Sequence, residues 1–139
     1  MQRVRTALLG VTHPHSSFHL KTLQTSPMVS GIVLYDPDGD ALESVRSEYK
    51  VESVYTDLEA LLAEEKFPVG IGCVENDLNA VLCNRLIEAG VHVMSEKPIG
   101  KNAKEVGSVV SAAREKRVKL GVMYSNRSHP ITQEARRLV

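Results

Sequence analysis

The loop at residues 10–17 follows an apolar segment and precedes a helical pattern. In nucleotide-binding α/β proteins, free backbone N–H groups at such a turn hold the diphosphate of a dinucleotide. Only the first glycine of the G-x-G-x-x-G fingerprint is present, Gly10, because Thr12 and His15 occupy the other two positions. The loop is either a degenerate phosphate loop or an ordinary turn. On the first interpretation, Gly10, Thr12, His13 and His15 contact the cofactor.

Asp36 ends the second apolar segment, about 20 residues beyond the loop. At this spacing a carboxylate accepts hydrogen bonds from the adenosine ribose 2′-OH and repels a 2′-phosphate. We therefore expect the cofactor to be NAD rather than NADP. The sequence Asp36-Pro37-Asp38-Gly39 also favours a turn, and the two roles of Asp36 are compatible.

Glu96 and Lys97 follow another apolar segment, so the strand predicted there delivers them to the carboxyl edge of the sheet. Ligands bind at that edge in open α/β sheets. A lysine fixed beside a cofactor can donate to a substrate oxygen and stabilise charge as a hydroxyl becomes a carbonyl. The alternative is a solvated lysine in a loop. We expect Lys97 to be catalytic and Glu96 to contact the cofactor.

The histidines His13, His15 and His19 also invite interpretation as metal ligands. No set of acidic residues accompanies them to complete a site, and the hydrolases that use a His-x-His pair have a longer barrel fold. We therefore expect no metal. The imidazoles are better placed beside the diphosphate, where positive charge favours an anion.

The elements that position these residues alternate along the chain. Short apolar runs predict strands at Val4–Leu9, Gly31–Tyr35, Ser53–Tyr55, Val69–Val74, Val91–Met94 and Val118–Met123. Helical periodicity predicts helices at Ser17–Gln24, Ala41–Tyr49, Leu58–Glu65, Leu78–Ala89 and Ala103–Arg117, with Asp57 and Asn102 as N-caps and Gly90 ending the fourth. Right-handed crossovers then predict an α/β fold, a doubly wound parallel (Rossmann) sheet of strand order 3-2-1-4-5-6.

Composition excludes several classes of function. The 139 residues carry 17 basic and 17 acidic side chains, and only 4% are aromatic, so neither a nucleic acid nor an anionic membrane is an expected partner. No stretch is apolar enough for a membrane span. The two cysteines, Cys73 and Cys83, lie in apolar segments, which predicts reduced core thiols and a cytoplasmic location.

Taken as a whole, the chain resembles the N-terminal half of the glucose-fructose oxidoreductase, inositol dehydrogenase and MocA-like oxidoreductases. The resemblance rests on Leu8-Leu9-Gly10, Tyr35-Asp36, Val54-Tyr55-Thr56-Asp57-Leu58, Ala89-Gly90-Val91-His92-Val93, Glu96-Lys97-Pro98 and Tyr124-Ser125-Asn126-Arg127. It implies a Rossmann domain that binds NAD or NADP, with Asp36 at the ribose and Lys97 contacting substrate in a proton relay.

The family usually carries Thr-Pro-Asn-x-x-His after its fourth strand, and of that motif the segment at residues 74–79 retains Asn76, a further expected cofactor contact. Relatives continue into an α+β substrate domain. We therefore expect residues 1–127 to form the dinucleotide-binding domain and residues 128–139 to begin the connection to a substrate domain.

The resulting hypothesis is the cofactor-binding part of a dehydrogenase that moves hydride between nicotinamide and a hydroxyl-bearing, sugar- or cyclitol-like small molecule. We expect the 139-residue chain to be inactive alone. The alternative hypothesis is a non-catalytic NAD(P)-binding regulator or partner-binding module. The apolar residues at 118–139 further predict a homo-oligomer.

Overall fold

The apolar segments form a six-stranded parallel sheet in the computed structural model, which describes residues 3–138. The strands are β1 (Val4–Leu9), β2 (Val29–Tyr35), β3 (Ser53–Tyr55), β4 (Val69–Gly72), β5 (His92–Ser95) and β6 (Leu120–Val122). The helices are α1 (Ser16–Thr25), α2 (Gly39–Tyr49), α3 (Leu58–Glu64), α4 (Asn79–Glu88), α5 (Ala103–Lys116) and α6 (Pro130–Arg137). The strand order is β3-β2-β1-β4-β5-β6, which confirms the predicted Rossmann fold.

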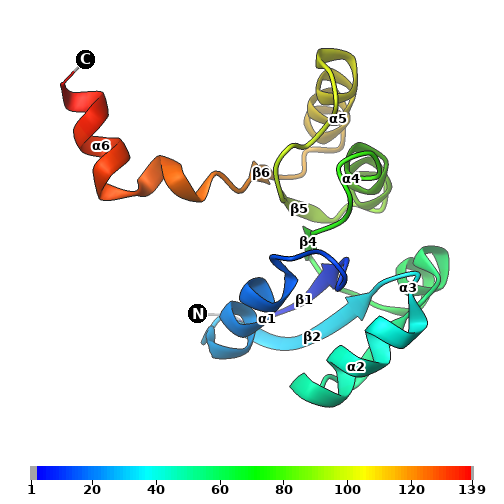
Figure 1. Ribbon diagram of the computed structural model, residues 1–139. Helices are drawn as coiled ribbons and strands as arrows, with labels where there is room; N and C mark the ends of the chain where they lie inside the picture. The colour runs from blue at the N-terminus through cyan, green and yellow to red at the C-terminus, as the bar shows by residue number, and fades with distance from the viewer. Residues whose placement is uncertain (1–2, 139) are drawn as a thin grey trace.

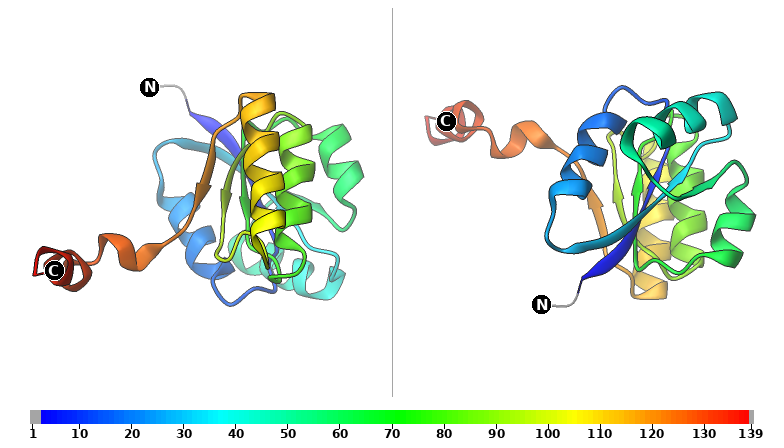
Figure 2. Two further views of the ribbon diagram at one scale, coloured as in Figure 1. Left: turned by 90° about the horizontal axis from the view of Figure 1, so that it is seen from above. Right: turned by 90° about the horizontal axis from the view of Figure 1, so that it is seen from below.

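Helices cover both faces of the sheet, α1 and α2 on one and α3, α4 and α5 on the other (Figures 1 and 2). Side chains alternate between the faces along each strand. Leu8 therefore packs in a cluster with Leu20 of α1, whereas Leu9 packs in a second cluster with Leu86 of α4. Cys73 and Cys83 are buried free thiols in these clusters, as predicted, and burial raises the pKa of Cys73 to about 12.

The predicted helix boundaries rest on caps that the structure contains. The Asp57 carboxylate accepts hydrogen bonds from the N–H groups of Glu59 and Ala60, at 2.7 and 3.0 Å. The Asn102 side chain accepts one from the N–H of Glu105 at 3.0 Å. Gly90 has a φ of 79°, in the left-handed region that glycine adopts without strain.

Some predicted element ends were wrong because hydrogen-bond register and caps, not apolarity, set them. β2 begins at Val29 rather than Gly31, since Val29 pairs with Val4 across an irregularity in the register. α2 begins at Gly39 rather than Ala41, because Asp38 caps it. β4, β5 and β6 follow their neighbours' register and end at Gly72, Ser95 and Val122. The ends of α1, α3, α4 and α5 shift by one residue.

The chain leaves the sheet after β6 through a short 3₁₀ helix (Ser125–Ser128) that was not predicted, and α6 then projects away from the sheet (Figure 1). Most of the segment expected to begin the connection, residues 128–139, is therefore helical. Its side chains Ile131 and Leu138 are 74% and 73% exposed. Met1, Gln2 and Val139, which belonged to the predicted domains, lie outside the described residues. Among residues 3–138, no helix combines the length and apolarity needed to cross a membrane.

Candidate cofactor and active site

The carboxyl ends of β1, β2 and β5 bring three predicted site segments to one edge of the sheet. Gly10 follows β1, Asp36 follows β2, and Glu96 with Lys97 follows β5. These strands lie on both sides of the switch point between β1 and β4, where the strand order reverses. Ligands bind at such a switch point in doubly wound sheets.

Gly10 makes the turn that the site requires. Its φ is 102°, and its N–H donates to the carbonyl of Tyr35 at 2.7 Å. A Cβ at this position would collide with the carbonyl oxygen of Cys73. Only glycine therefore lets the chain pass this close to β4, and the first position of the fingerprint is structurally required.

Asp36 is buried and folds back onto the loop. Its Oδ2 accepts hydrogen bonds from the N–H groups of Val11 (2.7 Å) and Thr12 (3.0 Å) and from the Thr12 hydroxyl (3.0 Å). Its Oδ1 accepts from the N–H of Asp38 at 2.9 Å, which confirms the turn role. Asp36 thus stabilises the loop through hydrogen bonds to Val11 and Thr12. The predicted ribose contact stays a prediction.

The rest of the loop is also bonded internally. The N–H of His15 donates to the ring Nδ1 of His13 at 3.1 Å, and the N–H of Ser16 donates to the carbonyl of His13 at 2.9 Å. Pro14 has no N–H. Burial lowers the pKa of His13, and the neighbouring His15 lowers it further.

His15, His19 and Glu96 form a cluster that joins α1 to the end of β5. Glu96 is 5% exposed, and its Oε1 lies 3.0 Å from His15 Nδ1 and 2.8 Å from His19 Nε2. Its Oε2 accepts from the N–H of Lys97 at 3.1 Å. Burial raises the pKa of the Glu96 carboxyl, but the bonds from His19, His15 and the Lys97 backbone outweigh it and lower the pKa overall.

Asn79 fixes the backbone that carries Lys97. This buried side chain donates through Nδ2 to the carbonyls of Glu96 (2.9 Å) and Pro98 (2.8 Å) and accepts from the Ser95 hydroxyl (2.9 Å). Both carbonyls flanking Lys97 are thereby held, while the Lys97 side chain remains exposed. Asn79 is a positioning residue by this geometry.

Sequence reasoning did not assign Asn79 to the site, and it placed His19 beside the diphosphate without its bond to Glu96. The available signal for Asn79 was indirect, because it stands where the family motif has histidine. By contrast, Asn76 was expected at the site. It is exposed, and its side chain makes no hydrogen bond to any residue in the described range 3–138. Within that same range, no group of three or more His, Cys, Asp or Glu side chains is placed to hold a metal ion.

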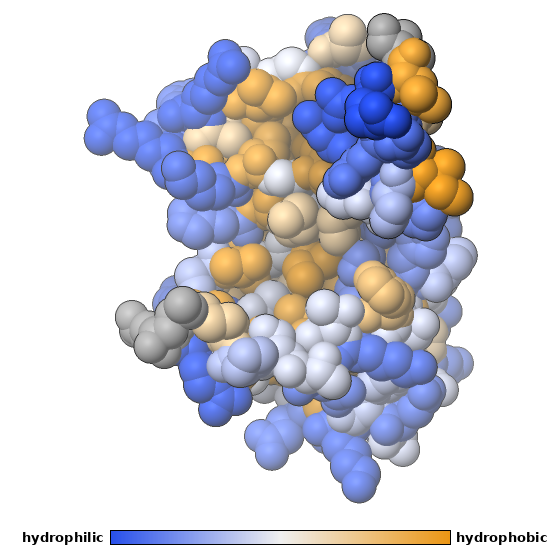
Figure 3. Space-filling model, turned by 90° about the vertical axis from the view of Figure 1, so that its left-hand side faces the viewer, coloured by the Kyte–Doolittle hydropathy of each residue, from blue (hydrophilic) through white to orange (hydrophobic). Residues whose placement is uncertain are grey.

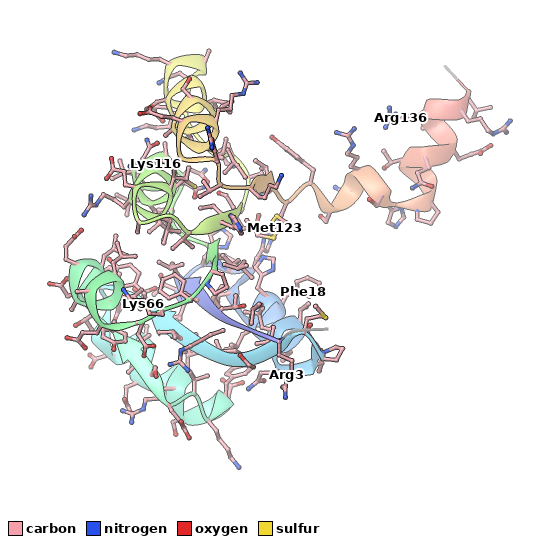
Figure 4. The ribbon with its side chains drawn as sticks, turned by 180° about the vertical axis from the view of Figure 1, so that it is seen from behind. Arg3, Phe18, Lys66, Lys116, Met123 and Arg136 are labelled. Carbon is pink, nitrogen blue, oxygen red and sulfur yellow. The ribbon has the colours of Figure 1, made fainter. Side chains whose placement is uncertain are left out.

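A cleft of about 930 Å³ opens beside Lys97, within the size range of small-molecule sites. Its lining includes His15, Phe18 and Met94 together with Tyr124 and Arg127 from the segment after β6. Figure 3 shows apolar side chains gathered in the middle of this face, with hydrophilic ones around them. In Figure 4, Phe18 and Met123 lie on the side from which α6 projects. The cleft thus combines an apolar floor with a few polar groups.

Known proteins share this sequence pattern. Residues 4–124 match the GFO/IDH/MocA family, described as an oxidoreductase family with an NAD-binding Rossmann fold. The chain is 30% identical over 96 residues to D-xylose 1-dehydrogenase (NADP(+)) 2 of Haloferax volcanii, covering 69% of this chain and 30% of that protein. It is 26% identical over 136 residues to UDP-N-acetylglucosamine 3-dehydrogenase of Acidithiobacillus ferrooxidans, covering 98% of this chain and 42% of that protein.

Solved structures share the fold. The WlbA dehydrogenase from Bordetella pertussis, in complex with NADH and UDP-GlcNAcA, is similar with a TM-score of 0.90 at 22% identity, over 99% of this chain and 41% of that one. Myo-inositol 2-dehydrogenase from Lactobacillus plantarum is similar with a TM-score of 0.87 at 19% identity, over 99% of this chain and 41% of that one.

These relatives are dehydrogenases, and this chain spans less than half the length of each. The family match covers the whole sheet and every segment of the site from the Gly10 turn to Tyr124. The chain therefore belongs to the GFO/IDH/MocA oxidoreductase family and forms its NAD(P)-binding Rossmann domain.

Proposed function

We propose that this chain is the cofactor-binding part of a dehydrogenase that transfers hydride between nicotinamide and a hydroxyl of a sugar- or cyclitol-like substrate. The observation that carries the proposal is the meeting of the Gly10 turn, Asp36 and Lys97 at one switch-point edge. Two relatives named as dehydrogenases of D-xylose and UDP-N-acetylglucosamine support the substrate class.

The residues present fit a dinucleotide. The Gly10 turn packs against the backbone of Cys73, which holds the start of the loop at the carboxyl edge of the sheet. The Thr12 and His15 side chains are exposed at the start of α1, where a diphosphate would lie. When bound, the nicotinamide supplies the hydride acceptor or donor.

In the proposed mechanism, Lys97 donates a hydrogen bond to the reacting oxygen of the substrate. The positive charge stabilises the negative charge that develops on this oxygen as the hydroxyl becomes a carbonyl and its proton is released to solvent through the open cleft. Asn79 keeps Lys97 in place by binding the carbonyls on either side of it. The apolar side chains of Phe18 and Met94 line the same cleft and offer the substrate an apolar surface.

We assign NAD as the preferred cofactor. The Asp36 carboxylate already accepts three hydrogen bonds through Oδ2 but one through Oδ1, so Oδ1 retains capacity for a ribose hydroxyl. The same negative charge would oppose a 2′-phosphate. One relative is named as NADP-dependent, so the choice differs within the family.

Calorimetric titration of the 139-residue chain with NAD and with NADP tests this function. The expected result is saturable one-to-one binding of both, with NAD binding more tightly. ATP, which shares the adenosine but lacks the nicotinamide half, serves as the comparison ligand. If neither NAD nor NADP bound, the result would contradict the proposed function.

A further inference from the structure

Most of the N–H groups that usually hold a diphosphate at this turn are occupied within the chain. Val11 and Thr12 donate theirs to the Asp36 carboxylate. The N–H groups of His15 and Ser16 donate within the loop itself. The negative charge of Asp36 directly beneath the loop also disfavours an anion there. A diphosphate at this turn therefore needs positive charge from side chains.

Two imidazoles at the start of α1 can supply that charge. The His15 ring is half-exposed beside the cleft, with 50% of its side chain accessible, whereas the His19 ring is nearly buried. Because a carboxylate only accepts hydrogen bonds, Nδ1 of His15 and Nε2 of His19 carry the protons that reach Glu96. This arrangement leaves the His15 Nε2 to bind a ligand.

The net charge of this cluster reverses with protonation. With both imidazoles protonated, His15, His19 and Glu96 together are positive; with both neutral, they are negative. The other charged or titratable groups facing the cluster are His13 and Glu75 from the loops after β1 and β4, Lys97 after β5, and Arg127 across the cleft. Lysine, arginine and carboxylate side chains ordinarily keep their charge between about pH 5.5 and 8.5, whereas histidine loses its charge there.

We propose that His15, oriented by Glu96, is the cationic group that binds the cofactor diphosphate in place of the occupied loop amides. Cofactor affinity consequently falls as the pH rises and the imidazoles lose their protons. The inference rests on the proposed function, since it names how the same site holds its cofactor. It differs from the usual mode, in which backbone N–H groups carry most of the diphosphate contact.

Calorimetry with NAD and with ADP-ribose, between about pH 5.5 and 8.5, tests the inference because histidine titrates in this range. ADP-ribose carries the diphosphate without nicotinamide, and that diphosphate stays fully ionised throughout. We expect both ligands to bind about tenfold more weakly at the alkaline end, the factor that a charge-assisted hydrogen bond accounts for.

Three variants separate the roles. His15→Gln keeps an N–H donor but has no charge, so its affinity should be low and should vary less with pH than that of the wild-type chain. His92→Gln changes a histidine at the start of β5, the opposite end of that strand from Glu96, and should retain the wild-type profile. Glu96→Ala removes the carboxylate that orients the His15 ring, so its affinity should also fall.

The outcomes are distinguishable. Binding without pH dependence, or a His15→Gln profile equal to that of the wild-type chain, would overturn the inference and leave the proposed function standing. A pH dependence seen for NAD but not for ADP-ribose would place His15 at the nicotinamide end and overturn the diphosphate assignment. Failure of both ligands to bind at every pH would overturn the proposed function together with the inference.

Discussion

His19 Nε2 and Glu96 Oε1 lie 2.8 Å apart although the two residues are 77 positions apart in the sequence. The bond joins the first turns of α1 to the segment that carries Lys97. Both side chains are largely buried, at 10% and 6% exposure. A hydrogen bond to a buried carboxylate is among the stronger kinds, so the cofactor loop and the lysine are held as one unit.

The lowered pKa of Glu96 predicts acid sensitivity. A carboxyl whose pKa is lower in the folded state stabilises the fold above its unfolded pKa, and this contribution disappears as the pH falls through the folded value. Urea unfolding of the wild-type chain and of Glu96→Gln, between about pH 6 and pH 3, measures it. At about pH 6 we expect the wild-type chain to have a larger free energy of unfolding than Glu96→Gln, and this difference should disappear as the pH falls to about 3. A difference that stays constant with pH would contradict a lowered pKa of Glu96.

Replacing Asp36 should reduce cofactor discrimination. In the wild-type chain we expect NAD to bind more tightly than NADP by about 1–3 kcal/mol, the size of a mismatched charged contact in a partly desolvated site. Asp36→Asn retains the volume and one acceptor oxygen, and Asp36→Ala removes both; each should shrink the gap in calorimetric titrations.

Asp38→Asn is the matched control, since it removes a neighbouring charge and keeps a side chain able to cap α2. It should leave the preference for NAD intact. A wild-type preference for NADP, or an unchanged ratio in Asp36→Asn, would refute the ribose assignment.

The 139-residue chain should bind cofactor without turnover. The cleft beside Lys97 is open, and Tyr124 on its rim is 59% exposed. An open site loses much of the several kcal/mol that positioning a second reactant contributes. An absorbance assay for NADH formation across polyols, sugars and nucleotide sugars checks this, with Lys97→Met as background. Turnover above that background would contradict the prediction.

Residues 118–138 should mediate self-association. Ile131 and Leu138 on α6 are exposed, and β6 is an edge strand with one unpaired side. Sedimentation velocity over a wide concentration range should show dimers or larger species. Removing residues 128–139 should weaken association and leave NAD binding intact. A monomer at high micromolar concentration, with these residues present, would leave the prediction unsupported.

Local patterns sufficed for the fold because each strand and helix carries its own signal. The apolar run ending at Leu9, the cap at Asp57 and the left-handed Gly90 each depend on neighbouring residues, and together they predict the strand order through the handedness rule. The site was predictable only in part. Gly10 and Lys97 are recognisable from strand ends, since the carboxyl edge of a parallel sheet gathers such residues.

The contacts within the site could not be predicted, because they join side chains from distant segments. Nothing near Asp36 indicates that its carboxylate occupies the N–H groups of Val11 and Thr12. Likewise, the bond from Asn79 to the carbonyl of Glu96 depends on how α4 packs beside β5. Tertiary packing determines which hydrogen-bond partners come within reach of these side chains.

Amide chemical-shift mapping of the isotope-labelled chain during titration with NAD locates the cofactor site residue by residue. We expect saturable shifts concentrated in residues 10–16, around Asp36 and at Glu96 and Lys97, which lie together at the carboxyl edge of the sheet. The groove at the amino ends of β1 and β2, lined by Arg3, Arg5 and Ser30, should be unaffected. Shifts concentrated in that groove, or no shifts at saturating NAD, would contradict a cofactor site at the carboxyl edge of the sheet.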